Sequence, residues 1–422
     1  MSSRALLGRL RRRCLMRHVL FAMGAVAGAG SCAQPECVVP DYRDAECRVI
    51  AENELGRLRT ASGVEVRLHD PLVPAWDSWA ALGRIREDAD GRVNVRVAGL
   101  DHFQLSLEGG PEGAVVPLEI DNFAWTSWVL SPPESFTNYQ RPSPLRSTYD
   151  VAVPAGERVV VDGFKGECPA RFNLAFVGDI QTNPLQFERI LERIAADAAA
   201  LEAAGEPLLG LVIVGDLTEW SYEEEFHTIA EILARSRVPI AVTPGNHDIF
   251  RKIHPAYNMN FGPGTYATSI CGVRIALFDS GSAELAHSVE ARLPELFERG
   301  ADDTLIAATH YPPHFALTGD GWTREDQAEI VLAELALAEA DLVVAGHVHA
   351  LLDYQKVEAG AHDLREVVVG TGGATQGVGV ARFGYLRVRI DGRPAPCFVE
   401  VPPPGWGGPA NEPLSAALPY CE

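Results

Sequence analysis

After Pro169 the sequence alternates short apolar runs with segments of helical periodicity, and this alternation constrains the fold more than any other feature. The helical segments are expected at roughly 184–203, 222–235, 289–299 and 324–338. Strands and helices that alternate over a long stretch indicate an α/β domain in which helices cover a sheet. Near the C-terminus, strands follow one another without helices between them, so the sheets are expected to be mixed.

Five of the expected strands end in side chains that are good ligands. In α/β sheets, ligands bind outside the carboxyl ends of the strands. Each group alone has an ordinary explanation, since an aspartate after a glycine is often a turn residue. Five such groups at equivalent positions are better explained by one shared site, whose oxygen and nitrogen donors suit Mn, Fe, Zn or Co. The groups are Asp179, Asp216, Asn246, His247, Asp248, His310, His347 and His349.

From residue 172 to about 390, the order of these groups resembles that of the calcineurin-like metallophosphoesterase superfamily. Its motifs are D-x-H, GD, GNH[DE], a single H and GHxH. GNHD followed by GHVH about a hundred residues later is a specific signal, whereas GD alone carries no information. The resemblance implies a four-layer αββα fold. The motifs stand here as Asp179-Ile180-Gln181, Gly215-Asp216, Gly245-Asn246-His247-Asp248, His310 and Gly346-His347-Val348-His349.

The resemblance also implies a site for two divalent metal ions. Asp216 would bridge them, because one carboxylate offers an oxygen to each ion. Two cations about 3.5–4 Å apart lower the pKa of a bridging water, and the resulting hydroxide attacks phosphorus in line with the leaving oxygen. The other implied ligands are Asp179 and His349 for the first ion, and Asn246, His310 and His347 for the second.

His247 and Asp248 are assigned by resemblance and not by spacing. In family members the histidine of GNH[DE] faces the leaving group, as a general acid or as a stabiliser of developing charge. The acidic residue after it would orient the histidine ring. The resemblance therefore makes His247 and Asp248 the expected catalytic pair.

Gln181 departs from the family pattern, because most members have a histidine at this position. A glutamine carbonyl binds metal as a neutral, weaker donor than imidazole. Gln181 either binds and shifts the first site toward harder ions such as Mn or Mg, or misses the metal and leaves a loose first site or room for substrate. A third interpretation is impaired activity. The first two are favoured, because the other ligand positions are filled and His247 is present.

The domain organisation is predicted from changes in texture along the chain. Residues 60–168 contain short alternating runs separated by Gly, Pro and Asp clusters, which indicate a small antiparallel β-sandwich. The phosphoesterase-like domain is expected at 169–402, and a Pro/Gly-rich tail at 403–422 would be pinned by Cys421. The glycine-rich stretch 368–379 lacks the Lys-Ser/Thr of a P-loop and is expected at the rim of the site.

The N-terminus has the pattern of an export signal. Residues 1–31 hold six arginines and no acidic residue, and the apolar run 19–29 is shorter than the roughly 20 residues that span a bilayer. The AGSC ending resembles a bacterial lipoprotein box with Cys32 as the lipidated residue; ordinary cleavage nearby is the alternative. RRRCLM also resembles a twin-arginine signal. Residues 32–59 are polar and are expected to form a tether.

The net charge limits the class of partner, and the cysteine content agrees with an exported protein. The 422 residues carry a net charge of −21, which argues against nucleic-acid binding because such binders normally present a basic face. If Cys14 lies in the signal and Cys32 is lipidated, six cysteines remain, and an even number in an exported chain indicates disulfides of unknown pairing. These are Cys37, Cys47, Cys168, Cys271, Cys397 and Cys421.

The predicted function is metal-dependent hydrolysis of phosphate mono- or diesters in the bacterial periplasm or outer envelope. The predicted partner is a phosphate-ester substrate, with membrane contact only through a lipid at Cys32. The alternative is a non-catalytic, metal-binding cell-surface module with the same fold and a weakened first site. Gln181 motivates this alternative, whereas His247 and the filled second site oppose it.

Overall fold

The structure is a computed structural model in which residues 39–422 form one compact unit. The predicted signal sequence and Cys32 lie outside the described residues. No described helix combines the length and apolar character needed to cross a membrane. The described residues are 37, 41, 43–52, 54–69, 83–124, 127–251, 256–314, 321–360, 362–376, 381–406 and 418–421.

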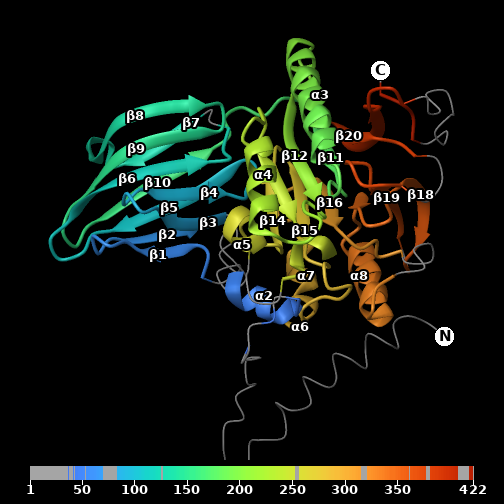
Figure 1. Ribbon diagram of the computed structural model, residues 1–422, viewed down its shortest axis with the longest axis horizontal. Helices are drawn as coiled ribbons and strands as arrows, with labels where there is room; N and C mark the ends of the chain where they lie inside the picture. The colour runs from blue at the N-terminus through green and yellow to red at the C-terminus, as the bar shows by residue number, and fades with distance from the viewer. Residues whose placement is uncertain are drawn as a thin grey trace, which may run out of the picture. The chain divides into compact units, whose positions relative to one another are not determined.

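The first part of the compact unit is a sandwich of two five-stranded sheets (Figure 1). Their strand orders are β1-β2-β5-β10-β7 and β3-β4-β6-β9-β8. Neighbouring strands are antiparallel except β4 and β6, which run parallel. The bounds are β1 Arg57–Arg59, β2 Glu65–His69, β3 Gly83–Glu87, β4 Val93–Val97, β5 His102–Glu108, β6 Ala114–Asp121, β7 Ser127–Ser131, β8 Phe136–Ser143, β9 Arg146–Val153 and β10 Arg158–Phe164.

Alternating side chains build the core of this sandwich. On β10, Val159 and Val161 are fully buried, whereas Val160 and Asp162 are half-buried. Side chains two residues apart share one face of a strand, so each sheet turns one apolar face inward. A single apolar cluster joins the inward faces of both sheets. The all-β, sandwich-like domain predicted from the sequence is confirmed.

The second part contains two mixed sheets, with orders β13-β12-β11-β20-β21 and β14-β15-β16-β17-β19-β18. The strands β11, β12 and β13 run parallel, as do β15, β16, β17 and β19. The bounds are β11 Phe172–Val177, β12 Leu208–Val214, β13 Ile240–Thr243, β14 Tyr266–Ile270, β15 Val273–Phe278, β16 Thr304–Thr309, β17 Leu342–Ala345, β18 Leu351–Glu358, β19 Asp363–Val369, β20 Gly384–Asp391 and β21 Arg393–Glu400.

The two mixed sheets pack face to face, with helices on their outer faces. One apolar cluster joins β11 and β12 to β16 and β17. A second packs α3 and α4 on the five-stranded sheet, and a third packs α7 and α8 on the six-stranded sheet. The predicted four-layer αββα fold is therefore confirmed. The helices are α3 Pro184–Ala203, α4 Glu223–Leu233, α5 Ala256–Phe261, α6 His287–Glu290, α7 Leu293–Leu296 and α8 Glu325–Leu337.

Local sequence explains where the helices begin and break. Helix α3 occupies its predicted range, because the Asn183 side chain accepts a hydrogen bond from the Gln186 amide at 3.1 Å and Pro184 fills the first helical position. The single helix predicted over 289–299 is wrong, since the structure has the two short helices α6 and α7 there. Pro294 lies in the first turn of α7, where it cannot continue a preceding helix because it lacks an N–H.

The segment expected to be a tether, 32–59, contains a packed helix. Helix α2 (Ala45–Glu52) buries Arg48, which donates from Nε to Asp279 Oδ2 at 2.6 Å and from Nη2 to Oδ1 at 3.0 Å. A two-pronged pair of this kind is geometrically specific, and losing one partner would leave the other charge buried and uncompensated. Residues 45–52 are therefore part of the folded unit. The sequence did not predict this packing, because the segment is polar and the partner of Arg48 lies 231 residues away.

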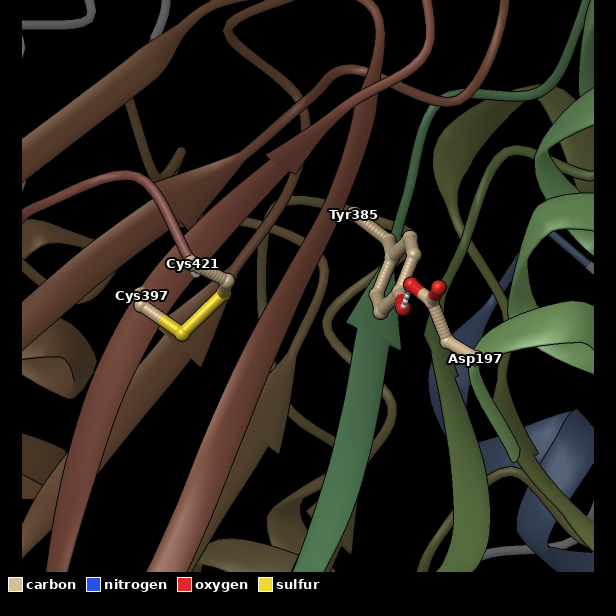
Figure 2. Close-up of a disulfide and its surroundings, with 4 residues drawn as sticks. All are labelled: Asp197, Tyr385, Cys397 and Cys421. Atoms are coloured by element: carbon tan, nitrogen blue, oxygen red, sulfur yellow. Dashed lines mark hydrogen bonds between the residues drawn. A yellow bond between two sulfur atoms is a disulfide. The ribbon is translucent and has the colours of Figure 1, made fainter. Parts of the chain in front are cut away.

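Disulfides fix two segments that surround the sheets. Cys168–Cys271 joins the stretch before β11 to the turn between β14 and β15. Cys397–Cys421 ties the tail to β21 (Figure 2), as the sequence predicted for Cys421. Each of the six cysteines predicted to be oxidised is disulfide-bonded. These bonds indicate an oxidising compartment outside the cytoplasm.

Tyr385 on β20 joins the helix layer to the five-stranded sheet. Its hydroxyl donates to Asp197 Oδ2 of α3 at 2.5 Å (Figure 2). Burial and the neighbouring Asp197 raise the pKa of Tyr385, so the hydroxyl stays protonated and donates. This bond holds α3 against β20, whose partner β11 leads into the first motif.

Glu52, at the end of α2, is a buried acid. Its Oε1 accepts from Asn258 Nδ2 at 3.0 Å and from the Gly264 amide at 2.6 Å. Burial, assisted by the nearby charge of Asp279, raises the pKa of Glu52 from 4.5 to about 8. A group with a raised folded-state pKa gives its full stabilisation below the unfolded value of 4.5 and loses it as the pH rises through about 8.

The variant Glu52→Gln is expected to remove this pH dependence, because glutamine keeps the Oε1 acceptor and cannot ionise. Thermal unfolding should give nearly equal melting temperatures for variant and wild type at pH 5, and a variant several degrees more stable at pH 9. The exposed neighbour Glu54→Gln serves as the control. A variant that gains nothing at pH 9 relative to pH 5 would contradict the assignment.

Candidate metal centre

The ligand-type residues predicted from the sequence meet at the carboxyl ends of strands from both mixed sheets. The sheets pack face to face, so loops after β11, β12 and β13 lie opposite loops after β16 and β17. Across this junction, His310 Nε2 lies 3.3 Å from Asp216 Oδ2, and His349 Nε2 lies 3.3 Å from Asp179 Oδ1. Asp179, Asp216 and His310 each offer one ligand atom within 4.8 Å of the others.

Asp216 occupies the centre of this arrangement. Its carboxylate is buried, with Oδ2 accepting from Gln181 Nε2 at 2.8 Å and lying beside His310. Its other oxygen, Oδ1, accepts from the backbone N–H of His247 at 2.9 Å. Oδ2 therefore faces side chains of the cluster, whereas Oδ1 is held by the backbone of the GNHD loop.

A second group of donors surrounds the side chain of Asn246. Its Oδ1 lies 2.9 Å from His310 Nε2 and 3.2 Å from His347 Nδ1. The backbone N–H of His347 donates to Asp179 Oδ2 at 3.0 Å, which links this group to the first aspartate. The six predicted ligand residues other than Gln181 therefore form one continuous cluster.

Backbone carbonyls orient two of the histidine rings. His310 Nδ1 donates to the Val214 carbonyl at 2.9 Å, and His349 Nδ1 donates to the Thr375 carbonyl at 3.0 Å. In each ring, the nitrogen that faces the cluster is thereby Nε2. A carbonyl on the outer nitrogen fixes the tautomer that presents a lone pair to a cation. Thr375 lies in the glycine-rich loop that was expected at the rim.

Burial and close charges shift the pKa values of the central groups. Burial raises the pKa of Asp179 to about 6, although His310 and His349 oppose the rise. Burial would also raise the pKa of Asp216, but the neighbouring His310 outweighs it and lowers that pKa. Conversely, Asp216 raises the pKa of His310 to about 9 against the effect of burial. Asp216 and His310 thus form a buried ion pair wherever no other cation balances the carboxylate.

Several of these residues are held in an unusual backbone conformation. Asp179, Asp216, His347 and His349 have φ angles of 60°, 55°, 70° and 50°. Residues other than glycine occupy this left-handed region at a cost of about 1–3 kcal/mol each, and such strain collects at functional sites. Gly245 allows close approach, because a Cβ there would lie 2.2 Å from Asp216 Oδ1.

A buried carboxylate oxygen of the cluster, Asp179 Oδ1, marks a place where a cation fits. Among the described residues, Asp179 Oδ1 and Gln181 Oε1 are buried and have no hydrogen-bond partner. A buried carboxylate oxygen without a donor is costly unless a cation neutralises it. With imidazole nitrogens and further carboxylate and amide oxygens around it, the cluster suits Mn, Fe, Zn or Co.

Gln181 lies inside the cluster. Its Nε2 is 2.8 Å from Asp216 Oδ2 and 2.8 Å from His349 Nε2. In this orientation the amide nitrogen, which is not a ligand, points toward the cluster. A half-turn of the amide would place the unpartnered Oε1 where Nε2 now lies, and an amide oxygen is an atom type that binds metal.

The structure brings His247 to the site but gives Asp248 a different role from the expected one. His247 Nδ1 donates to the Glu219 carbonyl at 2.8 Å, so Asp248 does not orient this ring. The buried carboxylate of Asp248 instead accepts from the backbone N–H groups of Leu217, Thr218 and Gly245. Asp248 therefore positions the loops that carry Asp216 and Asn246. Burial and the nearby Asp216 raise the pKa of Asp248 to about 7.

Sequence reasoning missed the groups that act through the backbone. The Glu219 and Thr375 carbonyls orient two histidines, yet a carbonyl is present at every position and leaves no sequence signal. Ser221 was also missed, although its hydroxyl donates to the His247 carbonyl at 2.5 Å. Ser221 directly follows the GDLTEW stretch in the sequence, but its contact with the His247 carbonyl could not be predicted from that position.

Comparison with known families agrees with the resemblance seen in the motifs. Residues 172–351 match the calcineurin-like phosphoesterase family. A probable cyclic nucleotide phosphodiesterase from Rhodopseudomonas palustris (strain ATCC BAA-98 / CGA009) is 27% identical over 134 residues, which are 29% of this chain and 49% of that protein. The chain thus spans about half the length of this curated relative. The resemblance seen in the motifs is confirmed for this segment.

Two solved structures are similar to this chain at low sequence identity. A purple acid phosphatase, PPD1, from yellow lupin (Lupinus luteus) seeds is 14% identical with a TM-score of 0.46, covering 70% of this chain and 68% of that one. GAP50, the anchor in the inner membrane complex of Plasmodium, is 12% identical with a TM-score of 0.43, covering 55% and 84%. Because both scores are low, the fold assignment rests on the sheets and helices themselves.

The variants Asp216→Asn and His310→Ala are each expected to lose most of the metal that the wild type retains after dialysis. Asparagine has no charge to balance a cation, and alanine has no ligand atom. Inductively coupled plasma mass spectrometry of the purified proteins measures the loss. The exposed His287→Ala is the control and should keep the wild-type metal content. Wild-type metal content in either site variant would show that the cluster is not the metal site.

Proposed function

We propose that this protein is a metal-dependent phosphoesterase that hydrolyses phosphate mono- or diesters. The observation that carries the proposal is the convergence of six further ligand-type side chains with the buried carboxylate of Asp216 in one cluster. The match of residues 172–351 to calcineurin-like phosphoesterases supports it. The relative named as a probable cyclic nucleotide phosphodiesterase makes phosphate diesters one candidate substrate class.

Two divalent cations are proposed to bind in this cluster. Asp216 would be a ligand to both of them. Such cations would supply the Lewis acidity that lowers the pKa of a water molecule and offsets charge on the phosphate. The unpartnered Oδ1 of Asp179 supports the first position. The proposed ligands are Asp179, Gln181 and His349 at the first position, and Asn246, His310 and His347 at the second.

His247 is proposed to act on the leaving group. Its backbone N–H is bound to Asp216, which keeps the residue against the cluster, and its Nδ1 is bound to the Glu219 carbonyl. The remaining nitrogen, Nε2, has no hydrogen-bond partner among the described residues. When protonated, it can donate to the leaving oxygen as the ester bond breaks, and the proton then stays on the alcohol product.

The disulfides support an exported protein, and lipidation at Cys32 extends this proposal to an anchored one. A loss of membrane association in a Cys32→Ser variant, compared with the wild type by fractionation of intact cells, would support the anchor. Unchanged fractionation would show that Cys32 does not carry a membrane anchor, and the proposal of an exported protein would still stand.

A non-catalytic, metal-binding module is the second candidate, and one observation favours it. Gln181 Nε2 donates to Asp216 Oδ2, so the amide occupies space beside the first position without offering a ligand atom. The complete set of other ligands and the placement of His247 oppose this candidate. The two candidates differ in turnover and in metal stoichiometry.

The direct test of the proposed function is hydrolysis of a matched aryl phosphate monoester and diester by the purified protein. Metal is removed first and then titrated back as Mn, Zn, Fe(II), Co or Mg, with bound metal counted. The proposal expects turnover that saturates near two metal ions per chain. Binding of one metal with no turnover under any ion would favour the non-catalytic module.

The variant Gln181→His tests the role of this position. If the wild type is an active enzyme with a glutamine-adapted site, histidine should change activity by no more than roughly tenfold and shift the preferred ion from Mn or Mg toward Zn. The measurement is kcat/KM in each metal. Gln181→Ala is the matched control for simple loss of the side chain. Activity that rises from near zero in Gln181→His would instead support the non-catalytic candidate.

A further inference from the structure

Beside the metal cluster, the large aromatic side chains of Trp220 and Phe250 are exposed to solvent. Trp220 is 56% exposed and Phe250 is 37% exposed, whereas aromatic residues elsewhere in the two domains are mostly core residues. Trp220 lies in the loop after β12, which carries Asp216, and Phe250 lies in the loop after β13, which carries His247. Exposed apolar surface at the edge of a site commonly marks a ligand-binding region.

The two rings continue directly from the proposed leaving-group residue. The Phe250 ring lies 4.8 Å from the His247 ring, and the Trp220 ring lies 6.0 Å from the Phe250 ring, measured between centroids. His247 is in turn bound through its backbone to Asp216. A line of rings therefore leads outward from the cluster on the side where the alcohol part of an ester would leave.

Glu225 holds the loop that carries Trp220. Its carboxylate, in the first turn of α4, accepts from the backbone N–H groups of Glu219, Trp220 and Tyr222 at 3.2, 3.1 and 2.8 Å. Three bonds to one side chain fix the loop without involving the Trp220 ring. The ring is therefore presented to solvent from a rigid support, which lowers the entropy cost of binding.

Ser221 fastens the Trp220 loop to the Phe250 loop. Its buried hydroxyl donates to the His247 carbonyl at 2.5 Å and accepts from the Phe250 N–H at 2.8 Å. Ser221 adopts a φ of 57°, a strained conformation for a residue with a side chain. The spacing between the two rings and His247 is thereby fixed by the backbone.

Tyr222 follows Ser221 in the same loop, and its ring already has a partner. The guanidinium of Arg251 lies over the Tyr222 ring at 4.0 Å from its centroid. This leaves Trp220 and Phe250 as the aromatic surface beside His247. Arg251 also adds positive charge at the edge of this surface, in a chain whose net charge is −21.

We propose that Trp220 and Phe250 form a subsite that stacks a planar aromatic group on the alcohol portion of the ester. The subsite rests on the proposed function, because it is defined relative to the leaving group at His247. Stacking accepts any flat π system, so the group is either a nucleobase or a simple aryl ring. The protein then selects esters by their leaving alcohol as well as by their phosphate.

The test compares substrates that share one leaving alcohol and differ only in the aromatic ring. Adenosine 5′-monophosphate and ribose 5-phosphate both release a primary alcohol, so their intrinsic reactivities are similar. Benzyl phosphate and ethyl phosphate form the aryl pair. If the enzyme prefers diesters, the methyl esters of the same compounds replace them. Dissociation constants of the corresponding phosphonates, whose C–P bond is not hydrolysed, are measured by isothermal titration calorimetry of the metal-loaded protein and provide a readout that does not depend on turnover.

The wild type should prefer adenosine 5′-monophosphate over ribose 5-phosphate by about tenfold or more in kcat/KM and in affinity, the size of one base–aromatic stack. Trp220→Leu should bring this ratio close to one while leaving ribose 5-phosphate turnover unchanged, and Trp220→Phe should restore part of it. Tyr139→Leu, which removes an exposed aromatic ring from β8 of the sandwich, is the control and should keep the ratio.

The outcomes separate this subsite from the proposed function. Turnover of ribose 5-phosphate without any preference for a ring, in rate and in affinity, overturns the subsite and leaves the phosphoesterase intact. If no ester is turned over, the proposed phosphoesterase function is wrong. The subsite is then tested by affinity alone: a preference for the compound with the ring that Trp220→Leu abolishes supports it, and no preference overturns it. If Trp220→Leu lowers the preference for the ring only in the adenosine pair, the group that stacks is a nucleobase. If it lowers the preference equally in the benzyl pair, the subsite accepts any aryl ring.

Discussion

The buried carboxylate of Asp216 is the group on which the arrangement of this site depends. It accepts from the Gln181 side chain and from the His247 backbone, and it pairs with His310. These partners come from the ends of three different strands in both mixed sheets. Because a buried negative charge is costly without compensation, the fold has to deliver these groups, or a cation, to this point.

The four-layer packing explains how one loop can contribute both to the metal cluster and to the proposed aromatic subsite. Parallel strands bring their carboxyl ends to the same edge of a sheet, and two such sheets face each other here. The loop after β12 begins with Asp216 at the cluster and continues to Trp220 at the surface. Asp248 and Glu225 hold its two parts through backbone N–H groups. Neighbouring hydrogen bonds within one loop therefore position the carboxylate and the proposed aromatic subsite.

The sequence predicted the features that depend on local pattern and missed those that depend on distant pairing. Strand-end motifs and the range of α3 were predictable, because apolar runs and caps are local signals. Helix α2 was not, since Arg48 is compensated by Asp279 some 231 residues away. The role of Asp248 was inferred by resemblance and differs in the structure, where backbone N–H groups compete for its carboxylate. The Glu219 carbonyl that replaces it leaves no trace in a sequence.

The central claim is that two cations share Asp216. The most direct measurement is anomalous diffraction at the manganese edge from crystals of the protein grown with Mn. The account predicts two anomalous peaks about 3.5–4 Å apart, each within bonding distance of the Asp216 carboxylate. A single peak, or two peaks of which neither contacts Asp216, would contradict it.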